Sequence, residues 1–174
     1  MSLTLYQTSV PAFVRGLKIL STLLDKARAH AEANNIDPAS LVNARLAPDM
    51  FTLAGQVQGA SDAAKTGTAR LASLPPPSFP DTETTFDELQ ARIAKTLDFI
   101  ATVSEAQINQ SEGGTITIKV GGKERTFASE PYLLGFILPN FYFHITTAYA
   151  ILRSQGVKLG KMDYLGTFES LQGE

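Results

Sequence analysis

The sequence predicts an all-α fold: a four-helix bundle with a β-hairpin inserted between the third and fourth helices. In four long stretches, apolar residues recur at spacings of three and four, the period of an amphipathic helix. Over residues 115–120 the period changes to two, which indicates a strand. The chain has 174 residues, a usual length for one domain, so we expect residues 1–174 to form a single domain.

The first helix is expected from Thr8 to about Ala33. Its apolar residues form one stripe, at Val10, Phe13, Leu17, Leu20, Leu24 and Ala27. The helix stops at the two asparagines of residues 34–35. Asp37 followed by Pro38 is typical of an N-cap and a first helical position, and it predicts a short helical turn.

The second helix is expected to begin near Pro48, because proline lacks an amide donor and biases Ala47 away from the α region. Its stripe consists of Met50, Leu53, Val57, Ala60, Ala64, Gly67 and Leu71. The small residues in the middle of this stripe would let the backbone of a partner helix come close. Four prolines within residues 73–84 then favour a stiff, extended crossover.

Thr85 and Glu88 have the spacing of a capping box and predict the start of the third helix. Its apolar stripe consists of Phe86, Leu89, Ile93, Leu97 and Ile100. We expect this helix to run to about Ser104.

A hairpin is expected next, because the alternating residues 115–120 precede a glycine pair, 121–122, that tolerates the positive φ of a tight turn. The expected register pairs Val120 with Lys123, Lys119 with Glu124, and Ile116 with Phe127. This register gives one charge pair and one apolar pair across the strands.

The fourth helix is expected from Ser129 to Gln155, with Gly156 in the left-handed conformation that ends many helices. Pro139 should kink it. Residues 157–174 have no sustained period, and we expect an ordered return loop followed by a frayed end.

The composition excludes several kinds of chemistry and partner. The absence of cysteine rules out disulfides, thiolate metal sites and cysteine nucleophiles. The net charge of −2 comes without a long basic run, so we expect no nucleic-acid partner. The most apolar stretch, residues 132–152, carries polar residues and a proline, so we expect no membrane span. Residues 1–6 lack the pattern of an export signal, and we expect a cytoplasmic protein.

The two histidines are the residues best suited to metal binding or proton transfer near neutral pH. His30 lies near the end of the first helix, where a charged imidazole complements the helix dipole, and we expect it at the surface. His144 shares a helical face with Ile137, Phe141, Ala148 and Ile151. It should therefore point into the bundle. Asn140, four residues earlier, leaves two interpretations open: a hydrogen-bonded core pair with His144, or part of a ligand site.

Four further polar residues have structural explanations. Asp49 is expected in the first turn of the second helix, where free backbone amides stabilise a carboxylate. Asp62 could face the interior, but exposure to solvent is the better interpretation. Tyr142 and Tyr149 are expected to pack, with their hydroxyls at the rim.

Three segments resemble the DinB/YfiT-like superfamily. The segment PNFYFHITTAYAILRSQGV, residues 139–157, resembles its last helix. The segments LAPDMF, residues 46–51, and LGKMDYLG, residues 159–166, extend the resemblance over nearly the whole chain. This pattern is similar to an uncharacterised branch of the superfamily, a domain of unknown function.

The resemblance implies a four-helix bundle of DinB/YfiT-like type, often dimeric. Many members bind a divalent metal through three histidines, and some transfer groups to low-molecular-weight thiols. By resemblance, two of those histidines would fall on Asn140 and His144, and the third on or near Gln56. Two of the three ligands are thus replaced by neutral amides, which bind zinc or nickel less well than imidazole does.

We therefore expect a polar site around Gln56, Asn140 and His144 that binds a small ligand or a weakly held divalent metal such as zinc or nickel. If the protein is an enzyme, the chemistry implied by the resemblance is thiol-dependent group transfer, with His144 as base or as the sole strong metal ligand. The alternative is a non-catalytic homodimeric interaction or structural protein, with an interface built from helix faces or the hairpin edge.

Overall fold

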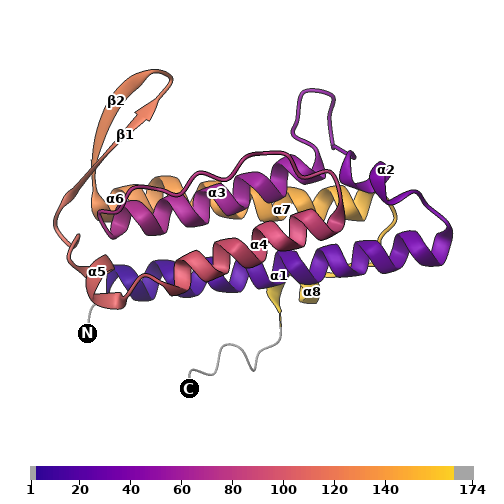
Figure 1. Cartoon of the computed structure of the whole chain (residues 1–174), viewed down its shortest axis with the longest axis horizontal. Coiled ribbons are helices and arrows are strands. Elements are labelled where there is room, and N and C mark those ends of the chain that lie inside the picture. The colour runs from indigo at the N-terminus through magenta and orange to yellow at the C-terminus, as the bar shows by residue number, and fades with distance from the viewer. Residues whose placement is uncertain (1–2, 167–174) are drawn as a thin grey trace.

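The computed structural model describes residues 3–166, which form a mostly helical structure with one two-stranded antiparallel hairpin (Figure 1). The elements are α1 (Leu5–Asn34), α2 (Pro38–Val42), α3 (Leu53–Leu71), α4 (Phe86–Ala101), α5 (Glu105–Asn109), β1 (Thr115–Val120), β2 (Lys123–Ala128), α6 (Ser129–Tyr132), the π-helix η1 (Leu133–Ile137), α7 (Leu138–Ser154) and α8 (Lys161–Leu165). The long helices α1, α3, α4 and α7 run alongside one another, and the hairpin projects from one end of them. Within residues 3–166, no helix is both long and apolar enough to span a membrane.

α1 begins at Leu5 rather than at Thr8, because Thr4 caps it. The Thr4 hydroxyl accepts a hydrogen bond from the backbone N–H of Gln7, and the Gln7 side chain accepts one in return. At the other end, Asn35 adopts the left-handed conformation, with a φ of 54°, and ends the helix. All residues of the predicted apolar stripe of α1 are buried.

α3 begins at Leu53, so the predicted start near Pro48 was wrong. Thr52 is its N-cap, and the Thr52 hydroxyl accepts a hydrogen bond of 3.2 Å from the backbone N–H of Gly55. The residues before Thr52 form a loop in which the Arg45 guanidinium donates to two backbone carbonyls. A capping side chain, rather than the proline, decides where this helix starts.

Small residues of α3 let a partner helix come close, as the sequence predicted, and α3 packs more extensively against α7 than against any other helix. A Cβ atom at Gly67 of α3 would lie 2.7 Å from the side chain of Ile137. On α1, a Cβ at Gly16 would lie 2.6 Å from the Phe141 ring. Cβ contacts this short are essentially never observed, so a larger residue at either position would displace the side chain that faces it.

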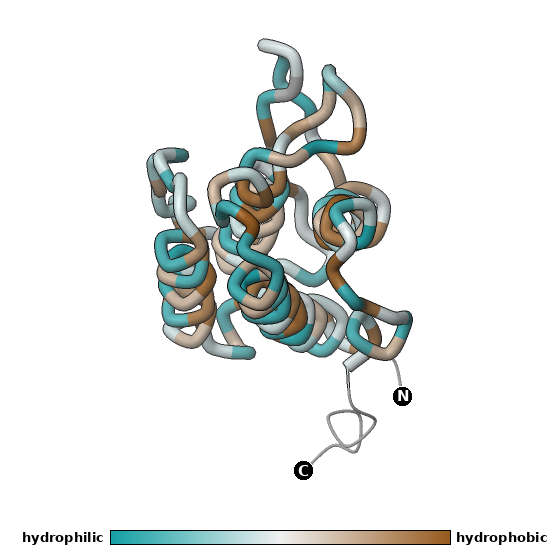
Figure 2. The backbone as a smooth tube through the Cα atoms, turned by 90° about the vertical axis from the view of Figure 1, so that its right-hand side faces the viewer, coloured by the Kyte–Doolittle hydropathy of each residue, from teal (hydrophilic) through white to brown (hydrophobic). Residues whose placement is uncertain are grey.

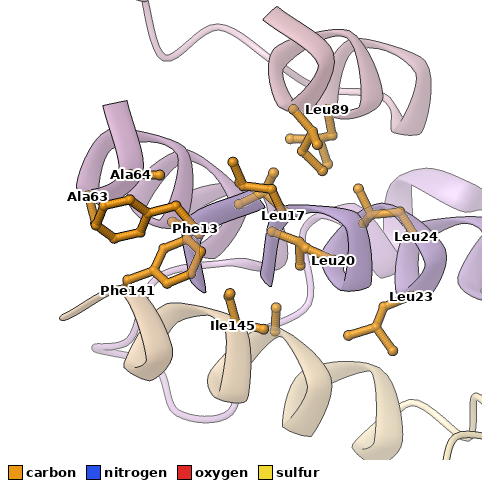
Figure 3. Packing of buried hydrophobic residues seen from close by; sticks show 14 of the residues in the cluster. Phe13, Leu17, Leu20, Leu23, Leu24, Ala63, Ala64, Leu89, Phe141 and Ile145 are labelled. Carbon is orange, nitrogen blue, oxygen red and sulfur yellow. The ribbon is translucent and has the colours of Figure 1, made fainter. Parts of the chain in front are cut away.

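The core lies between the four long helices. Figure 2, which looks along them, shows apolar residues on the sides that face one another. In Figure 3, the Phe13 ring of α1 lies between Ala63 of α3 and Phe141 of α7. The rings of Phe13 and Phe141 meet edge to face, with centroids 5.2 Å apart.

The crossover after α3 is extended, as its prolines predicted, and Arg92 of α4 fastens it. We call residues 73–84 the strap. The Arg92 guanidinium, 3 % exposed, donates to the carbonyl of Pro80 and to Glu83 at 3.0 Å, and it pairs with Asp81 at 2.9 Å. The buried Arg92 therefore fastens the strap to α4, together with Glu88, which accepts hydrogen bonds from the backbone and hydroxyl of Thr84. Gln58 of α3 adds a hydrogen bond to Glu83.

α4 is shorter than predicted. It ends at Ala101 instead of continuing to Ser104. The Ser104 hydroxyl instead accepts a hydrogen bond from the backbone N–H of Gln107 and caps the short α5.

The hairpin has the predicted register, in which Val120 pairs with Lys123 and Ile116 with Phe127. The fourth helix runs without a break over residues 129–154, close to its predicted bounds, and the π-helix η1 lies within it between α6 and α7. Pro139 is the second residue of α7, and its missing N–H cannot bond to the turn before it, where the helix widens.

The segment after α7 contains one element that the sequence analysis did not predict. The short helix α8 lies within the expected return loop and packs against α1. The frayed end was expected at the chain terminus, and residues 167–174 lie outside the described residues.

Candidate functional site

His144 on α7 is turned inward, as predicted, and it contacts Gln56 on α3. His144 is 8 % exposed and Gln56 is 1 % exposed. The imidazole Nδ1 lies 2.8 Å from the carboxamide Oε1. The carboxamide nitrogen of Gln56 donates to the backbone carbonyl of Phe51 at 3.4 Å, which leaves its oxygen facing the ring.

This orientation of Gln56 sets the tautomer of His144. Because Oε1 can only accept a hydrogen bond, Nδ1 carries the proton and donates it. Nε2 then has a free lone pair. Among the described residues no side chain hydrogen-bonds to Nε2, and this nitrogen is not fully enclosed. The imidazole therefore presents one acceptor atom to an incoming group.

Gly59 provides the space in which the imidazole lies. A Cβ at this position would be 2.5–2.7 Å from three atoms of the His144 ring. Gly59 is one turn after Gln56 on α3. One turn of this helix therefore supplies both the hydrogen-bond partner of the ring and the flat surface beneath it.

Two exposed aromatic rings border His144. Phe51, in the loop before α3, is 64 % exposed, and its ring lies at 5° to the imidazole plane with centroids 6.5 Å apart. Phe143 is 55 % exposed and meets the imidazole edge-on at 5.5 Å. We call His144, Gln56, Gly59, Phe51 and Phe143 the His144 site. The site combines one hydrogen-bond acceptor, Nε2 of His144, with an apolar rim formed by the two phenylalanine rings.

The electrostatic surroundings keep the imidazole neutral. Burial lowers the pKa of His144 below its ordinary value of 6.5, because the charged ring loses its hydration. The negative charge of Asp62, on the same face of α3, opposes this shift in part. A neutral ring with a free Nε2 can accept a hydrogen bond or take up a proton.

The core pair expected between His144 and Asn140 is not formed. Asn140 is partly buried, and in the described part of the chain its side chain makes no hydrogen bond to His144. Gln56 occupies the role expected of Asn140. Of the two amides named in the sequence analysis, one therefore contacts the imidazole and the other lies beside it on α7.

The remaining candidates have structural roles. His30 is partly buried near the end of α1, where its Nδ1 lies 3.2 Å from the Asn34 side chain. Asp49 is exposed in the loop before α3 and not in a helical turn, so that prediction was wrong. Asp62 is partly exposed, but it binds Arg92 at 2.7 Å and its own helical neighbour Lys65.

The two tyrosines of α7 differ in exposure. Tyr149 is partly buried and packs edge-on against Tyr164, with centroids 5.9 Å apart. Tyr142 is 41 % exposed and lines a small cavity with Arg15. The sequence analysis predicted packing for both residues, and Tyr149 is the one that is packed.

The residues present do not fit a transition-metal site. Gln56 directs its only oxygen at Nδ1 of His144 and not at a position that both residues could share. Within residues 3–166, no group of three or more His, Asp or Glu side chains is arranged to hold a metal ion. One imidazole with neutral amides is a weak donor set for zinc or nickel.

The sequence analysis missed Phe51 and Gly59 as parts of this site. Phe51 lies in a loop, so no periodicity marks it. Gly59 was one of several small residues on a helix, and its partner could be assigned only once α7 was placed against α3.

Comparisons with known proteins agree with the resemblance. Residues 5–165 match the family described as Domain of unknown function (DUF1993). The chain is similar to a crystal structure of a DinB family member protein from Shewanella denitrificans, with 43% sequence identity, a TM-score of 0.86, and coverage of 94% of this chain and 92% of that one. No curated protein matches the chain. The chain is therefore DinB-like and belongs to the DUF1993 family.

Proposed function

We propose that the four long helices form a four-helix bundle of the DinB type and that the His144 site binds a small organic ligand. The ligand would carry an N–H, O–H or S–H group that donates a hydrogen bond to Nε2 of His144. Support comes from one observation above all, the bond between Nδ1 and Gln56 Oε1, because it leaves Nε2 as a free acceptor.

The rim defines the rest of the ligand. Phe51 and Phe143 expose their rings beside the imidazole, so a flat or apolar body can lie against them while its polar group reaches Nε2. The proposal does not include zinc or nickel, since the donor set does not suit either metal.

Thiol-dependent group transfer is the reaction implied by the resemblance. In that reaction the S–H proton of a low-molecular-weight thiol would pass to Nε2 of His144, and the thiolate sulfur would form the new bond to the transferred group. The bond between that group and its original carrier would break, and the carrier would leave with the electron pair and take the proton from His144. A neutral imidazole is the form required of such a base, which agrees with the lowered pKa of His144.

Imidazole NMR tests the binding proposal directly, because the chain has only two histidines. Phenol supplies a flat ring and an O–H donor, and toluene is its matched control without the donor. We expect phenol to shift the Nε2 signal of His144 in a saturable way, and toluene to leave Nε2 unchanged. The signals of His30 serve as an internal control, because His30 lies near the end of α1 and not in the site.

The variant Gln56→Met removes the acceptor of Nδ1 with little change in volume. We expect it to weaken phenol binding, because the tautomer of His144 is no longer fixed. A phenol titration that moves His30 as much as His144, or that leaves both unmoved, would contradict the proposal. 2-Mercaptoethanol in place of phenol tests whether thiols are accepted.

The second candidate function is a non-catalytic homodimer. It is favoured by large apolar side chains exposed along the fourth helical region, including Leu134, Phe136 and Phe143. Light scattering over a dilution series tests it: a dimer should dissociate or persist as a species of twice the chain mass. A monomer at every concentration would exclude this alternative.

A further inference from the structure

A small cavity lies where α1, α7 and α8 meet, and none of its lining residues belongs to the His144 site. Its volume is about 40 Å³, and it opens to solvent. One water molecule needs about 10–15 Å³, so the cavity holds a group of two or three water-sized atoms. Its walls are Ala12, Arg15, Gly16, Ile19, Tyr142 and Ile145, closed by Tyr164 and Leu165 of α8.

Arg15 gives this cavity a positive charge that the described residues do not balance. One of its terminal nitrogens donates to the backbone carbonyl of Leu165. Its Nε–H is buried and finds no acceptor among residues 3–166, and Arg15 forms no ion pair with any of them. A buried donor on a charged group is costly to leave unpaired, so the position calls for an acceptor.

Two tyrosines, Tyr142 and Tyr164, line the cavity together with Arg15. The Tyr164 hydroxyl shares a hydrogen bond of 2.9 Å with Thr146, which fixes its orientation. Burial, and then the neighbouring Tyr164, raise the pKa of Tyr142, whereas Arg15 opposes the shift. Tyr142 is therefore a neutral O–H donor at physiological pH.

We propose that Arg15, Tyr142 and Tyr164 bind the carboxylate group of a short aliphatic acid. A guanidinium offers Nε–H and a terminal N–H as a planar fork that matches the two oxygens of a carboxylate. One cation balances one monoanion, and the small volume suits a carboxylate better than a phosphate. The aliphatic walls at Ile19 and Ile145 would contact the short hydrocarbon part.

The test is an NMR titration of the arginine Nε–H signals of the full chain with sodium acetate. Arg15→Lys assigns the Arg15 signal by its loss. We expect acetate to shift that signal in a saturable way with a dissociation constant in the millimolar range. Sodium chloride at the same concentration should leave it in place. Acetate that shifts nothing, or chloride that gives an equal shift, would overturn the proposal.

Tyr142→Phe provides a second variant, which removes only one oxygen atom and preserves the ring. We expect it to weaken acetate binding about threefold to tenfold, the effect of one hydrogen bond. Arg153→Lys, at an exposed position in the last turn of α7, is the matched control and should leave the binding unchanged. Equal affinity in Tyr142→Phe and wild type would remove Tyr142 from the site and contradict the proposal. The signals of His144, recorded with the same samples, keep this result separate from the phenol experiment.

Discussion

Because Gly59 has no side chain, the His144 imidazole can lie directly against α3. A Cβ there would lie 2.5–2.7 Å from three ring atoms, so the Gly59→Ala variant must move the ring or separate α3 from α7. Alanine favours a helix by about 1 kcal/mol over glycine, but overpacking a core costs about 1–3 kcal/mol. We expect the free energy of unfolding to fall by up to about 2 kcal/mol in urea denaturation, with altered His144 NMR signals.

Gly135 supplies the control for this prediction. It lies in η1, and a Cβ added there would meet no atom within 4 Å. The Gly135→Ala variant should therefore be as stable as the wild type or slightly more stable. A similar loss of stability in both variants would show that close approach to His144 is not the cause.

The lowered pKa of His144 makes stability depend on pH. Between the folded-state pKa and the unfolded value of 6.5, the unfolded chain binds more protons than the folded chain. The free energy of unfolding should therefore fall as the pH decreases from about 6.5 through the folded pKa. Urea denaturation of wild type and His144→Gln, at matched pH values, isolates this contribution. An identical pH profile for the two proteins would refute it.

At the level of single residues, the sequence predicted the direction of His144 but not its partner. The helical period placed the ring inward, because period depends on the local chain alone. The contact with Gln56 came only from the family resemblance, and Asn140 was the partner that the period favoured. Contacts between distant segments depend on how two helices are placed against each other, and no local pattern encodes that placement.

At the level of elements, the predictions that depended on local capping and turn residues were confirmed. Both predicted capping residues of α4 and the glycine pair of the hairpin act within a few residues, and the structure confirms them. The start of α3 was wrong because the proline was given more weight than Thr52, whose hydroxyl caps the helix. The π-helix η1 was not predicted, since its apolar residues fit an ordinary helical period equally well.

Arg92 makes more polar contacts with the strap than any other residue of α4, and its contribution is testable. Arg92→Met retains the aliphatic stem but removes the bonds to the Pro80 carbonyl, Glu83, Asp62 and Asp81. Because the carboxylates are partly exposed and can be rehydrated, we expect a loss of about 1–3 kcal/mol of stability rather than more. Limited proteolysis should cleave the strap faster in this variant than in the wild type.

Arg28→Met is the matched control for the strap variant. It breaks an ion pair between Arg28 of α1 and Asp87 of α4, both exposed. Exposed pairs contribute about 0–1 kcal/mol, so this variant should change the stability little and leave the strap protected. If Arg92→Met has an equally small effect, Arg92 is not what holds the strap.

At the level of the whole molecule, the sequence predicted the main parts but not their mutual fit. Apolar stripes identified four long helices, and the structure buries most of their residues between them. Leu97 is only partly buried, and Met50 lies in the loop before α3. The placement of α8 against α1, and hence the cavity with Arg15, was not predicted, because the last segment has no sustained period. The His144 site and the cavity with Arg15 each contain a polar group without a hydrogen-bond partner among the described residues. Both lie where helices distant in sequence meet.

The hairpin contacts few other elements, although Ile116 and Ile118 are buried. β1 and β2 pair only with each other in the described chain, and their main contacts are with α6. A two-stranded sheet is marginally stable by itself, so local opening should need less free energy there than in α3. We expect amides of residues 115–128 to exchange at least about tenfold faster than those of α3, by hydrogen exchange of the full chain.

Hydrogen exchange measured over a dilution series also tests the homodimer alternative. Fast exchange of the hairpin at all concentrations would fit a monomer whose strand edges face solvent. Slow exchange that becomes fast on dilution would mean that a second copy covers an edge, as expected for the homodimer alternative. Slow exchange at every concentration would contradict the prediction, because it would require support within the chain that the contacts with α6 do not supply.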